Sequence, residues 1–588
     1  MDLYSFYTGQ CFDAYRYFGA HYENGKTTFR TFAPHARRIS LICECNNWQE
    51  LPMKAVSDGN IFEITVPEAK PGMMYKYRIY GKTGRCIDHC DPYGFGMELR
   101  PQNASYIRDL SELIFEDEAW MRKRTDCRKK PLNIYELHLG SWRKKDNEKE
   151  TGWYNYEELA DLLIPYLEEC GYNYIEVMPL SEHPSDQSWG YQNTGFFSPT
   201  SRYGTATQLK AFVDKLHHHN IGIIMDFVPV HFAVDDYALA MYDGTALYEY
   251  PHPDVGQSEW GSNNFIHARG EVRSFLMSAA NFWLDEFHFD GLRMDAIRNL
   301  IYWQGDESRG ENKNSIDFLK CMNQGLKERH ASAILAAEDS TSYGNVTKAT
   351  WAGGLGFDYK WDMGWMNDTL VYFRTGPEYR TRDYHKLTFS MHYYYNENFL
   401  LPLSHDEVVH GKATIAQKMN GNYEDKFPQA KALYLYMYGH PGKKLNFMGN
   451  EIAQLREWDE KREQDWDILT YPLHDDFWRF MKKLNHLYLR TPALYAKDFE
   501  QDGFRWIDCH QEQKCLYIFE RSDGKQRVLC VFNFSNKPQT YLLHLQYCSK
   551  LDLMISSDWN AERSLTLTHG VVPMALPPYC GRFYLEKR

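Results

Sequence analysis

Long apolar runs and clusters of basic residues are both missing from this sequence. No stretch is apolar for long enough to cross a bilayer, and residues 1–5 lack the basic start and apolar core of an export signal. We therefore expect neither a membrane segment nor an export signal. The 66 basic and 79 acidic residues give a net charge of −13 and form no basic patch or run, which argues against nucleic-acid binding. An uncharged partner is favoured.

Cysteine follows no repeating spacing, and glycine-rich phosphate loops are missing. The 13 cysteines are scattered and odd in number, which fits reduced thiols better than a disulfide framework. We accordingly expect the cytoplasm as the compartment. No glycine-rich loop follows any strand pattern, which weakens the nucleotide-binding versions of an open sheet.

Aromatic residues, in contrast, are abundant. The chain has 43 tyrosines and 16 tryptophans, whose flat apolar faces and polar edges suit stacking against sugar rings. Most of them we interpret as ordinary packing residues. The aromatic content therefore permits a carbohydrate ligand without identifying one.

The chain divides into three regions. A length of 588 residues is too great for one compact core and predicts two to four domains. Residues 1–115 alternate apolar and polar side chains between turn signals, as in a small β-sandwich. Residues 116–485 alternate strand and helix patterns, and residues 486–588 return to β alternation as a C-terminal all-β domain. The predicted strands of the first region are residues 28–32, 39–43, 61–66 and 74–80.

The middle region predicts a parallel sheet, because strands and helices alternate over about 350 residues. The number of units fits a closed (β/α)8 TIM barrel with insertions, and an open doubly wound sheet is the alternative. The expected fold class is thus multidomain α/β with a central barrel between two β-domains. The predicted strands are residues 133–137, 174–178, 221–227, a short strand within 289–296, 333–337, 399–403 and 445–448.

Polar side chains gather at the ends of these strands. In such a barrel the working residues lie at the C-terminal ends of the strands, so these residues are candidates for one site. Taken singly, each could be a solvated cap or a surface ion pair, but four such ends at one mouth favour a functional site. The candidates are Asp226 and His231, Arg293 and Asp295, Glu338 and Asp339, and His405, Asp406 and Glu407.

Residues 289–296 place a cation beside a carboxylate. Side chains on a strand alternate between faces, so Arg293 and Asp295 share a face. A guanidinium keeps its neighbour ionised, and an ionised carboxylate can attack carbon as a nucleophile. On its own the pair could also be an ordinary ion pair. Two carboxyl groups flanking one bond, one ionised and one protonated, are what glycoside chemistry requires.

The strand-end motifs resemble the four signature regions of the α-amylase superfamily, glycoside hydrolase family 13. Other segments are similar to those of its 1,4-α-glucan (glycogen) branching enzyme subgroup, and the resemblance covers nearly the whole chain. The signature-like motifs are residues 226–231, 291–296, 337–340 and 404–407; the subgroup-like segments are residues 189–192, 199–204, 439–444 and 447–451 followed by 456–458.

The resemblance implies roles for particular residues. Asp295 would be the nucleophile, Glu338 the general acid and base, and Asp406 the third carboxylate, holding sugar hydroxyls. Like-charge repulsion should raise the pKa of Glu338 so that it can donate a proton. Asp339 receives no role. The expected substrate-binding residues are Tyr191, which would stack on the sugar ring, and Asp226, His231, Arg293, His405, Trp189 and Trp458.

The resemblance also sets expectations about partners. The N-terminal region resembles a family 48 carbohydrate-binding module, and the substrate would be an α-glucan such as glycogen or amylose. Residues 231–270 are short for the calcium-binding insertion of other superfamily members, so we expect no metal, and we expect no cofactor. We expect a monomer.

The expected reaction is chain transfer that forms an α-1,6 branch in glycogen synthesis, by a retaining double displacement. One alternative is an α-1,6 debranching hydrolase of the isoamylase type, which shares the barrel, the carboxylates and the binding module. Another is a non-catalytic glucan-binding protein, against which the intact Asp295, Glu338 and Asp406 set argues.

Overall fold

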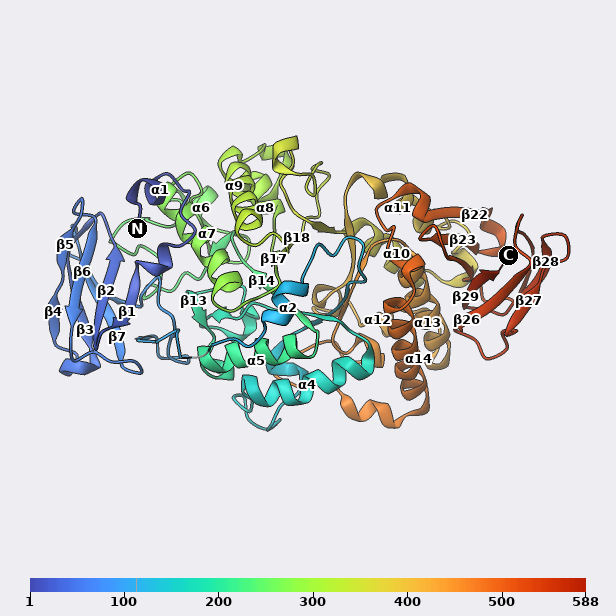
Figure 1. The fold of residues 1–588 in the computed structure, drawn as a ribbon, viewed down its shortest axis with the longest axis horizontal. Helices are drawn as coiled ribbons and strands as arrows, with labels where there is room; N and C mark the ends of the chain where they lie inside the picture. Colours follow the sequence, from blue (N-terminus) through green and yellow to red (C-terminus); the bar gives the residue numbers. More distant parts are fainter. Residues whose placement is uncertain (113, 588) are drawn as a thin grey trace. The chain divides into compact units, whose positions relative to one another are not determined.

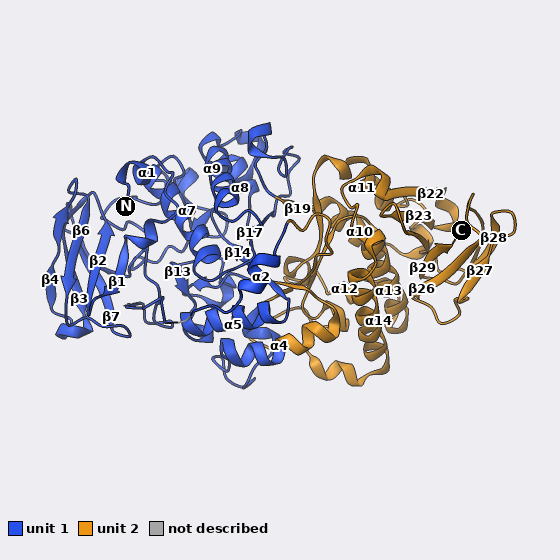
Figure 2. Ribbon diagram, viewed as in Figure 1, with its two compact units in different colours: residues 1–125, 138–162, 176–357 blue, residues 126–137, 163–175, 358–588 orange. Residues whose placement is uncertain are grey.

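The computed structural model describes residues 1–112 and 114–587 and divides into two compact units (Figure 2). Unit 1 holds residues 1–125, 138–162 and 176–357. Unit 2 holds residues 126–137, 163–175 and 358–588. The chain therefore enters unit 2 twice, briefly, before it stays there from residue 358 onward.

Two antiparallel sheets form the N-terminal part of unit 1. In β7 (Met74–Gly81), every second residue is buried, which is the pattern of a strand with one face on a core. The ring of Tyr75 meets that of Phe29 with centroids 4.9 Å apart. The first sheet has the order β1 (Gly19–Glu23), β2 (Lys26–Phe32), β6 (Ile61–Val66), β5 (Lys54–Val56); the second has β4 (Glu50–Pro52), β3 (Ala36–Cys43), β7, β8 (Cys86–His89), with β9 (Ser105–Tyr106) also paired to β7.

Residues 1–18, which we call the N-terminal strap, pack on helix α7 (Gly270–Asp285) within unit 1. The backbone N–H groups of Cys11 and Ala14 donate to the hydroxyls of Ser274 and Ser278, over 3.3 and 3.0 Å. Small side chains on α7 thus let the strap approach closely. The strap begins with helix α1 (Leu3–Tyr7).

Eight parallel strands form a closed barrel, which confirms the predicted fold class. All residues of these strands are buried, as expected where helices cover a parallel sheet. Strand β19 escaped the sequence analysis because it has three residues, one of them Lys360. In barrel order the strands are β10 (Asn133–Leu137), β11 (Tyr174–Val177), β14 (Gly222–Phe227), β17 (Gly291–Met294), β18 (Ile334–Ala337), β19 (Tyr359–Trp361), β20 (Phe399–Leu403) and β21 (Lys443–Phe447).

Long helices alternate with the barrel strands along the chain (Figure 1). Their starts follow ordinary capping chemistry: Thr205 and Gln208 form a reciprocal capping box at the start of α5. The long helices are α4 (Tyr156–Cys170), α5 (Ala206–His218), α7, α9 (Lys313–Arg329), α10 (Met363–Arg374), α13 (Tyr423–Gly439) and α14 (Pro472–Leu489).

The C-terminal part of unit 2 is all β, as predicted. Its core includes Leu516, Ile518, Leu529 and Val531, which are fully buried on neighbouring strands. The larger sheet has the order β22 (Phe504–Gln511), β23 (Leu516–Ser522), β24 (Arg527–Asn533), β29 (Cys580–Lys587), β26 (Lys550–Ser556), β27 (Ser564–Thr566), and a second sheet pairs β25 (Gln539–His544) with β28 (Val571–Leu576).

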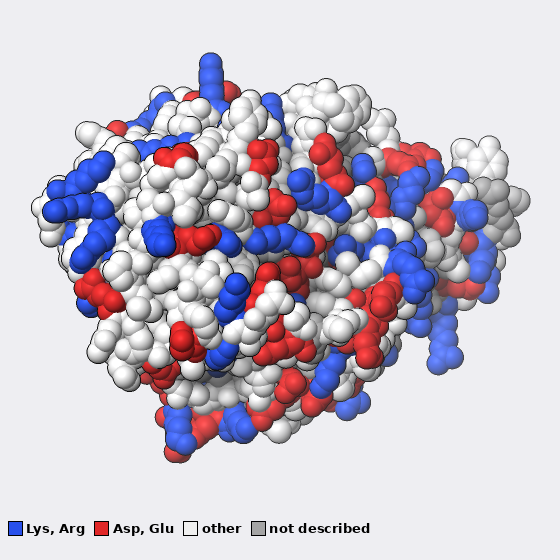
Figure 3. Space-filling view, turned by 60° about the vertical axis from the view of Figure 1, so that its left-hand side comes forward, with Lys and Arg blue, Asp and Glu red and all other residues white. Residues whose placement is uncertain are grey.

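Charged side chains of both signs are interspersed over the face of the molecule in Figure 3. That face gathers no single-sign field of the kind that attracts a charged polymer. Across the described residues, no helix combines the length and the apolar character needed to span a bilayer.

Candidate active site

Three neighbouring barrel strands in unit 1 align the first group of candidate residues (Figure 1). Strands β14 and β17 pair with Asp226 opposite Arg293, and β17 pairs with β18 so that Met294 lies opposite Ala337. Because parallel strands end at the same edge, the residues that follow Met294 and Ala337 emerge together. Those residues are Asp295 and Glu338.

Arg293 lies at the centre of this group and is 1% exposed. Its Nη1 donates to Asp226 Oδ1 over 2.5 Å and to Asp295 Oδ1 over 3.0 Å, and its Nη2 lies 3.6 Å from Glu338 Oε2. Burial alone would lower the pKa of Arg293, but the surrounding negative charges, Asp226 foremost, raise it well above its usual value. Arg293 therefore stays a permanent cation among three carboxyl groups.

Tyr191 extends this network. Its hydroxyl donates to Asp226 Oδ2, and Arg293 Nη1 donates to the same hydroxyl over 3.3 Å. The guanidinium carbon of Arg293 lies 6.0 Å from the centre of the Tyr191 ring, within cation–π range. The half-buried Tyr191 is thus fixed at its polar end, while part of the side chain stays exposed.

A tight turn after β17 aims Asp295. The N–H of Asp295 donates to the carbonyl of Phe227, over 3.0 Å. The next residue, Ala296, has a φ of 50°, a left-handed conformation that costs a non-glycine residue about 1 kcal/mol. In return, the Ala296 N–H reaches Glu338 Oε2, over 2.8 Å. One turn therefore positions both carboxyl groups.

Exposure separates the roles within the group. The side chains of Asp295 and Glu338 are 14% and 18% exposed, whereas that of Asp226 is 2% exposed. Two carboxyl groups can thus reach a ligand, and the third stays behind Arg293. Asp295 and Glu338 are therefore placed to react, and Asp226 and Arg293 hold them in position.

His231 follows β14 and stays neutral. It lies on β15 (His231–Phe232), which pairs with β16 (Asn263–Asn264), and it is 2% exposed. Burial lowers the pKa of His231 to about 4. Its buried Nδ1 has no hydrogen-bond partner among the described residues. A neutral imidazole here can hydrogen-bond an uncharged hydroxyl.

Unit 2 holds the second group, which follows β20. His405 donates through its backbone N–H to Glu136 Oε2, over 3.1 Å, and its Nδ1 lies 2.5 Å from Glu136 Oε1. Its Nε2 lies 3.6 Å from Asp406 Oδ1. The side chain of Asp406 is 50% exposed. Glu136 thus orients the imidazole, and the neighbouring carboxylate remains accessible.

Glu136 was missed by the sequence analysis. It lies on β10, all of whose residues are buried, so it reads as part of an apolar strand. The available signal was a charged residue inside that strand, because a buried carboxylate needs a partner.

Trp189 and Trp458 have different surroundings. Trp458 is 6% exposed, and its ring centroid lies 5.2 Å from that of Phe447 and 6.3 Å from that of His405. Other side chains of the protein therefore cover most of the Trp458 ring. Trp189 is half-buried in a turn, with a φ of 55° followed by a φ of 95° at Gly190.

Asp339 serves the loop after β18. It is 1% exposed, and it accepts from the N–H of Thr341 over 3.0 Å and from the Thr341 hydroxyl over 3.1 Å. These bonds form a turn of the type that aspartate favours. Asp339 therefore shapes the backbone next to Glu338.

Three family models match separate parts of the chain. Carbohydrate-binding module 48 (isoamylase N-terminal domain) matches residues 17–94, the catalytic domain of alpha amylase matches residues 159–243, and the alpha amylase C-terminal all-beta domain matches residues 506–578.

Curated relatives match over most of their length. The chain is 45% identical over 544 residues to the 1,4-alpha-glucan branching enzyme GlgB of Fusobacterium nucleatum, covering 91% of this chain and 88% of that protein. The protein belongs to the 1,4-alpha-glucan branching enzyme family. The GlgB of Geobacillus stearothermophilus is 43% identical over 548 residues, covering 91% of this chain and 85% of that one. A debranching hydrolase is not favoured, because these branching-enzyme family members match at such identity.

Solved structures agree with the fold of this branching enzyme family member. The pullulanase from Bacillus acidopullulyticus has a TM-score of 0.73 at 17% identity, covering 97% of this chain and 75% of that one. A pullulanase from Anoxybacillus sp., complexed with maltotetraose, has a TM-score of 0.73 at 16% identity, covering 100% of this chain and 89% of that one. At such identities the likeness concerns the fold.

Proposed function

We propose that this enzyme cleaves an α-1,4-glucan and transfers the released chain to a 6-hydroxyl of an acceptor glucan. Family membership supports the reaction class. The proposed site rests on the contacts of Arg293, whose guanidinium lies close to two accessible carboxyl groups, Asp295 and Glu338. The closer contact of Arg293, 3.0 Å to Asp295 against 3.6 Å to Glu338, favours ionised Asp295 over ionised Glu338, which leaves Glu338 as the group to carry the proton.

In the first step, the Asp295 carboxylate attacks the anomeric carbon of the donor. The bond from that carbon to the 4-oxygen breaks, and Glu338 gives its proton to that oxygen, so the rest of the donor leaves with a free 4-hydroxyl. A covalent glycosyl ester on Asp295 remains. The contact of 3.0 Å from Arg293 favours the ionised nucleophile. A raised pKa for Glu338 stays a prediction.

In the second step, the 6-hydroxyl of the acceptor attacks the same carbon. The ester bond to Asp295 breaks, and the Glu338 carboxylate takes the hydroxyl proton. Two inversions give net retention and an α-1,6 linkage. Exclusion of water from the ester decides between transfer and hydrolysis.

The remaining candidates support the sugar. We assign Asp406 to the 2- and 3-hydroxyls, because it is accessible and follows a barrel strand, like the other two carboxylates. We assign His405 and His231 to hydroxyls of the sugar and Tyr191 to stacking on its ring, whereas the buried Asp226 acts through its contacts with Arg293 and Tyr191. Trp189 remains a substrate-binding candidate. For Trp458, its burial against His405 favours positioning of that imidazole over direct stacking.

We further propose three domains: a glucan-binding module over residues 1–115, the catalytic barrel over residues 116–485 and an all-β domain over residues 486–588. The three matched segments lie one in each. All 13 cysteines lie in the described part of the chain and are free, which supports a reducing compartment such as the cytoplasm.

Incubation with linear amylose tests the reaction class. Branching should lower the iodine colour and create α-1,6 signals in proton NMR, with little increase in reducing ends. A rise in reducing ends that matches the loss of α-1,4 bonds would instead establish hydrolysis. Asp295→Ala should remove both changes, and full activity in that variant would exclude Asp295 as the nucleophile.

A further inference from the structure

Trp260 is an exposed aromatic residue whose ring contacts that of His231. We propose that it forms a platform on which a glucose ring of the donor glucan stacks, one subsite beyond the ring that Asp295 attacks. This rests on the proposed function, because it places the sugar next to His231. Trp260 is 45% exposed, although burial would be favoured for so large an apolar side chain.

The position of Trp260 comes from a ring contact. Its ring centroid lies 5.1 Å from that of His231, with the two planes inclined at 40°. His231 is itself 2% exposed and neutral. The exposed indole therefore lies next to His231. A glucan chain that extends from the reaction centre past His231 meets its flat apolar face.

One tether joins Trp260 to the reaction centre. Gln192 donates from Nε2 to the carbonyl of Trp260, over 3.0 Å. Gln192 directly follows Tyr191, whose hydroxyl donates to Asp226. The Trp260 N–H also donates to Ser258 Oγ, over 3.2 Å. The backbone on both sides of the indole is thus held.

A second tether fixes the base of the same loop, which we take as residues 252–262. Gln304, nine positions after Asp295, donates from Nε2 to the carbonyls of Gln257 and Asp254, over 2.7 and 2.9 Å. Arg309 contacts the carboxylate of Asp254, over 2.6 Å. A loop held in its binding conformation loses little entropy when a ligand binds.

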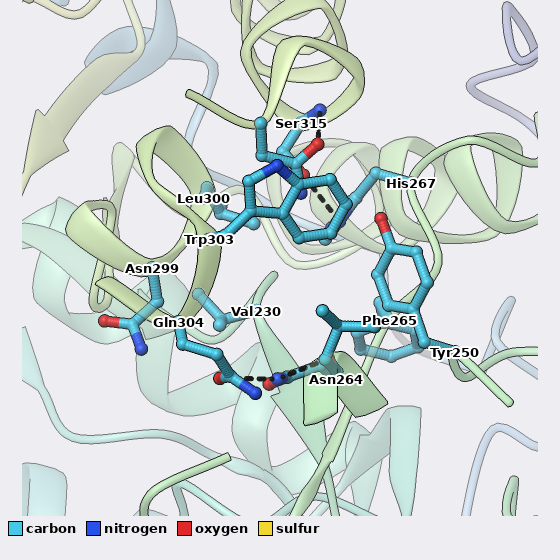
Figure 4. Close-up of a pocket in the computed structure, with 12 residues that line it drawn as sticks. Val230, Tyr250, Asn264, Phe265, His267, Asn299, Leu300, Trp303, Gln304 and Ser315 are labelled. Carbon is cyan, nitrogen blue, oxygen red and sulfur yellow. Dashed lines mark hydrogen bonds between the residues drawn. The ribbon is translucent and has the colours of Figure 1, made fainter. Parts of the chain in front are cut away.

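A small cavity borders residues 252–262, since Val255 is one of the residues that line it. A cavity of about 20 Å³ lies there, lined in part by Tyr250, Asn264, Trp303 and Gln304, and Gln304 hydrogen-bonds Asn264 across it (Figure 4). That volume suits one water molecule. A glucose ring does not fit this cavity, so the proposed sugar contact lies on the exposed Trp260 ring.

Substitution of Trp260 tests the platform. Trp260→Ala should raise the KM for amylose about 10-fold, as expected for loss of a central aromatic contact, and should leave kcat within about 2-fold. Trp260→Leu, which keeps apolar packing without a flat ring, should raise KM similarly, and Trp260→Phe should retain part of the affinity. The debranched product should also show a changed distribution of transferred chain lengths.

Trp559→Ala is the matched control, because that indole is 84% exposed in the C-terminal domain; it should leave KM unchanged. An unchanged KM in a folded Trp260→Ala or Trp260→Leu variant would overturn the platform, as would a fall in kcat alone. The reaction of the wild type distinguishes failure of the platform from failure of the proposed function. If the wild type forms branches and the Trp260 variants have an unchanged KM, only the platform is refuted. If the wild type hydrolyses amylose, the proposed function is refuted.

Discussion

Arg293 shows how one side chain can organise several carboxyl groups. A guanidinium is planar and presents five N–H donors in a rigid fork, whereas a lysine ammonium is a single flexible point charge. The contacts of Arg293 with Asp226, Asp295 and Glu338 use both terminal nitrogens. The shape of this cation, and not its charge alone, holds the group together.

We therefore predict that Arg293→Lys lowers kcat on amylose by roughly 10²-fold, because a lysine cannot contact all three carboxyl groups at once. Circular dichroism should show that the fold is retained. Initial rates of α-1,6 linkage formation measure the effect.

Arg479→Lys supplies the control for this substitution. Arg479 is 69% exposed and pairs with Asp475 on its own helix, so its replacement should leave the rate unchanged. Equal rates for Arg293→Lys and the wild type would show that charge alone is sufficient at this position.

At the scale of elements, the start of β17 is held as firmly as its end. Asp290 precedes the strand and is fully buried. It accepts from Trp120 Nε1 over 2.8 Å, from His217 Nε2 over 3.1 Å and from the N–H of Ile223 over 2.7 Å. The buried carboxylate therefore ties helix α5, strand β14 and a preceding segment to the strand that leads to the nucleophile.

Protonated His217 is part of this anchor. Burial alone would lower the pKa of His217, but the carboxylates of Asp290 and Asp117 raise it to about 9. Since this value exceeds the unfolded value of about 6.5, the stabilisation is complete below pH 6.5 and is lost as the pH rises through 9.

We predict that His217→Ala lowers the free energy of unfolding by roughly 3 kcal/mol at pH 6.5, because two buried carboxylates each lose one partner, although Asp290 keeps Arg124 and Asp117 keeps His288. Thermal unfolding from pH 6 to 9.5 measures this, and the gap between variant and wild type should narrow above pH 9. His218→Ala, at an exposed neighbour on α5, should have little effect. A gap that does not depend on pH would contradict the charged state of His217.

The same elements show what sequence patterns could predict. Strands of five buried residues, such as β10 and β20, match the predicted bounds, because a buried parallel strand is predominantly apolar in sequence. Strand β19 has three residues and no such run. His217 reads as the end of a helix, since its carboxylate partners at 117 and 290 are brought close only by the fold.

The residues of the candidate site also differ in whether the sequence could predict them. Residues at strand ends, such as Asp295 and Glu338, could be found from position alone, because the barrel geometry brings strand ends together. Glu136 lies inside a strand and Trp260 lies in an irregular loop, so neither position follows a periodic pattern. Their importance arises from contacts with His405 and His231, which only the folded chain brings about.

At the scale of the whole molecule, the N-terminal strap links the first residues of the chain to the middle of unit 1. Gly270, the first residue of α7, allows this contact: a Cβ there would lie 1.8 Å from the carbonyl oxygen of Tyr7. The ring of Phe12 also lies beneath Arg329 of α9, 4.2 Å from its guanidinium carbon. The strap therefore packs against two helices.

We predict that Gly270→Ala detaches the strap, because the new methyl group overlaps backbone that cannot move aside without breaking these contacts. The expected loss is roughly 1–3 kcal/mol, and limited proteolysis should cut within residues 1–18 sooner than in the wild type. Gly344→Ala is the control, since a Cβ there meets nothing within 4 Å. Unchanged proteolysis in Gly270→Ala would show that the strap accommodates the methyl group.

The strap also sets an order of events during synthesis. Cys11 and its partner Ser274 are separated by 263 positions, and ribosomes add about 5–20 residues per second. Residues 1–18 must therefore wait on the order of tens of seconds after their own synthesis before α7 exists. Phe6 and Phe12, both buried in the finished protein, remain without Ser274 of α7 and Arg329 of α9 during that time, so the packing of the strap is completed long after the strap is made.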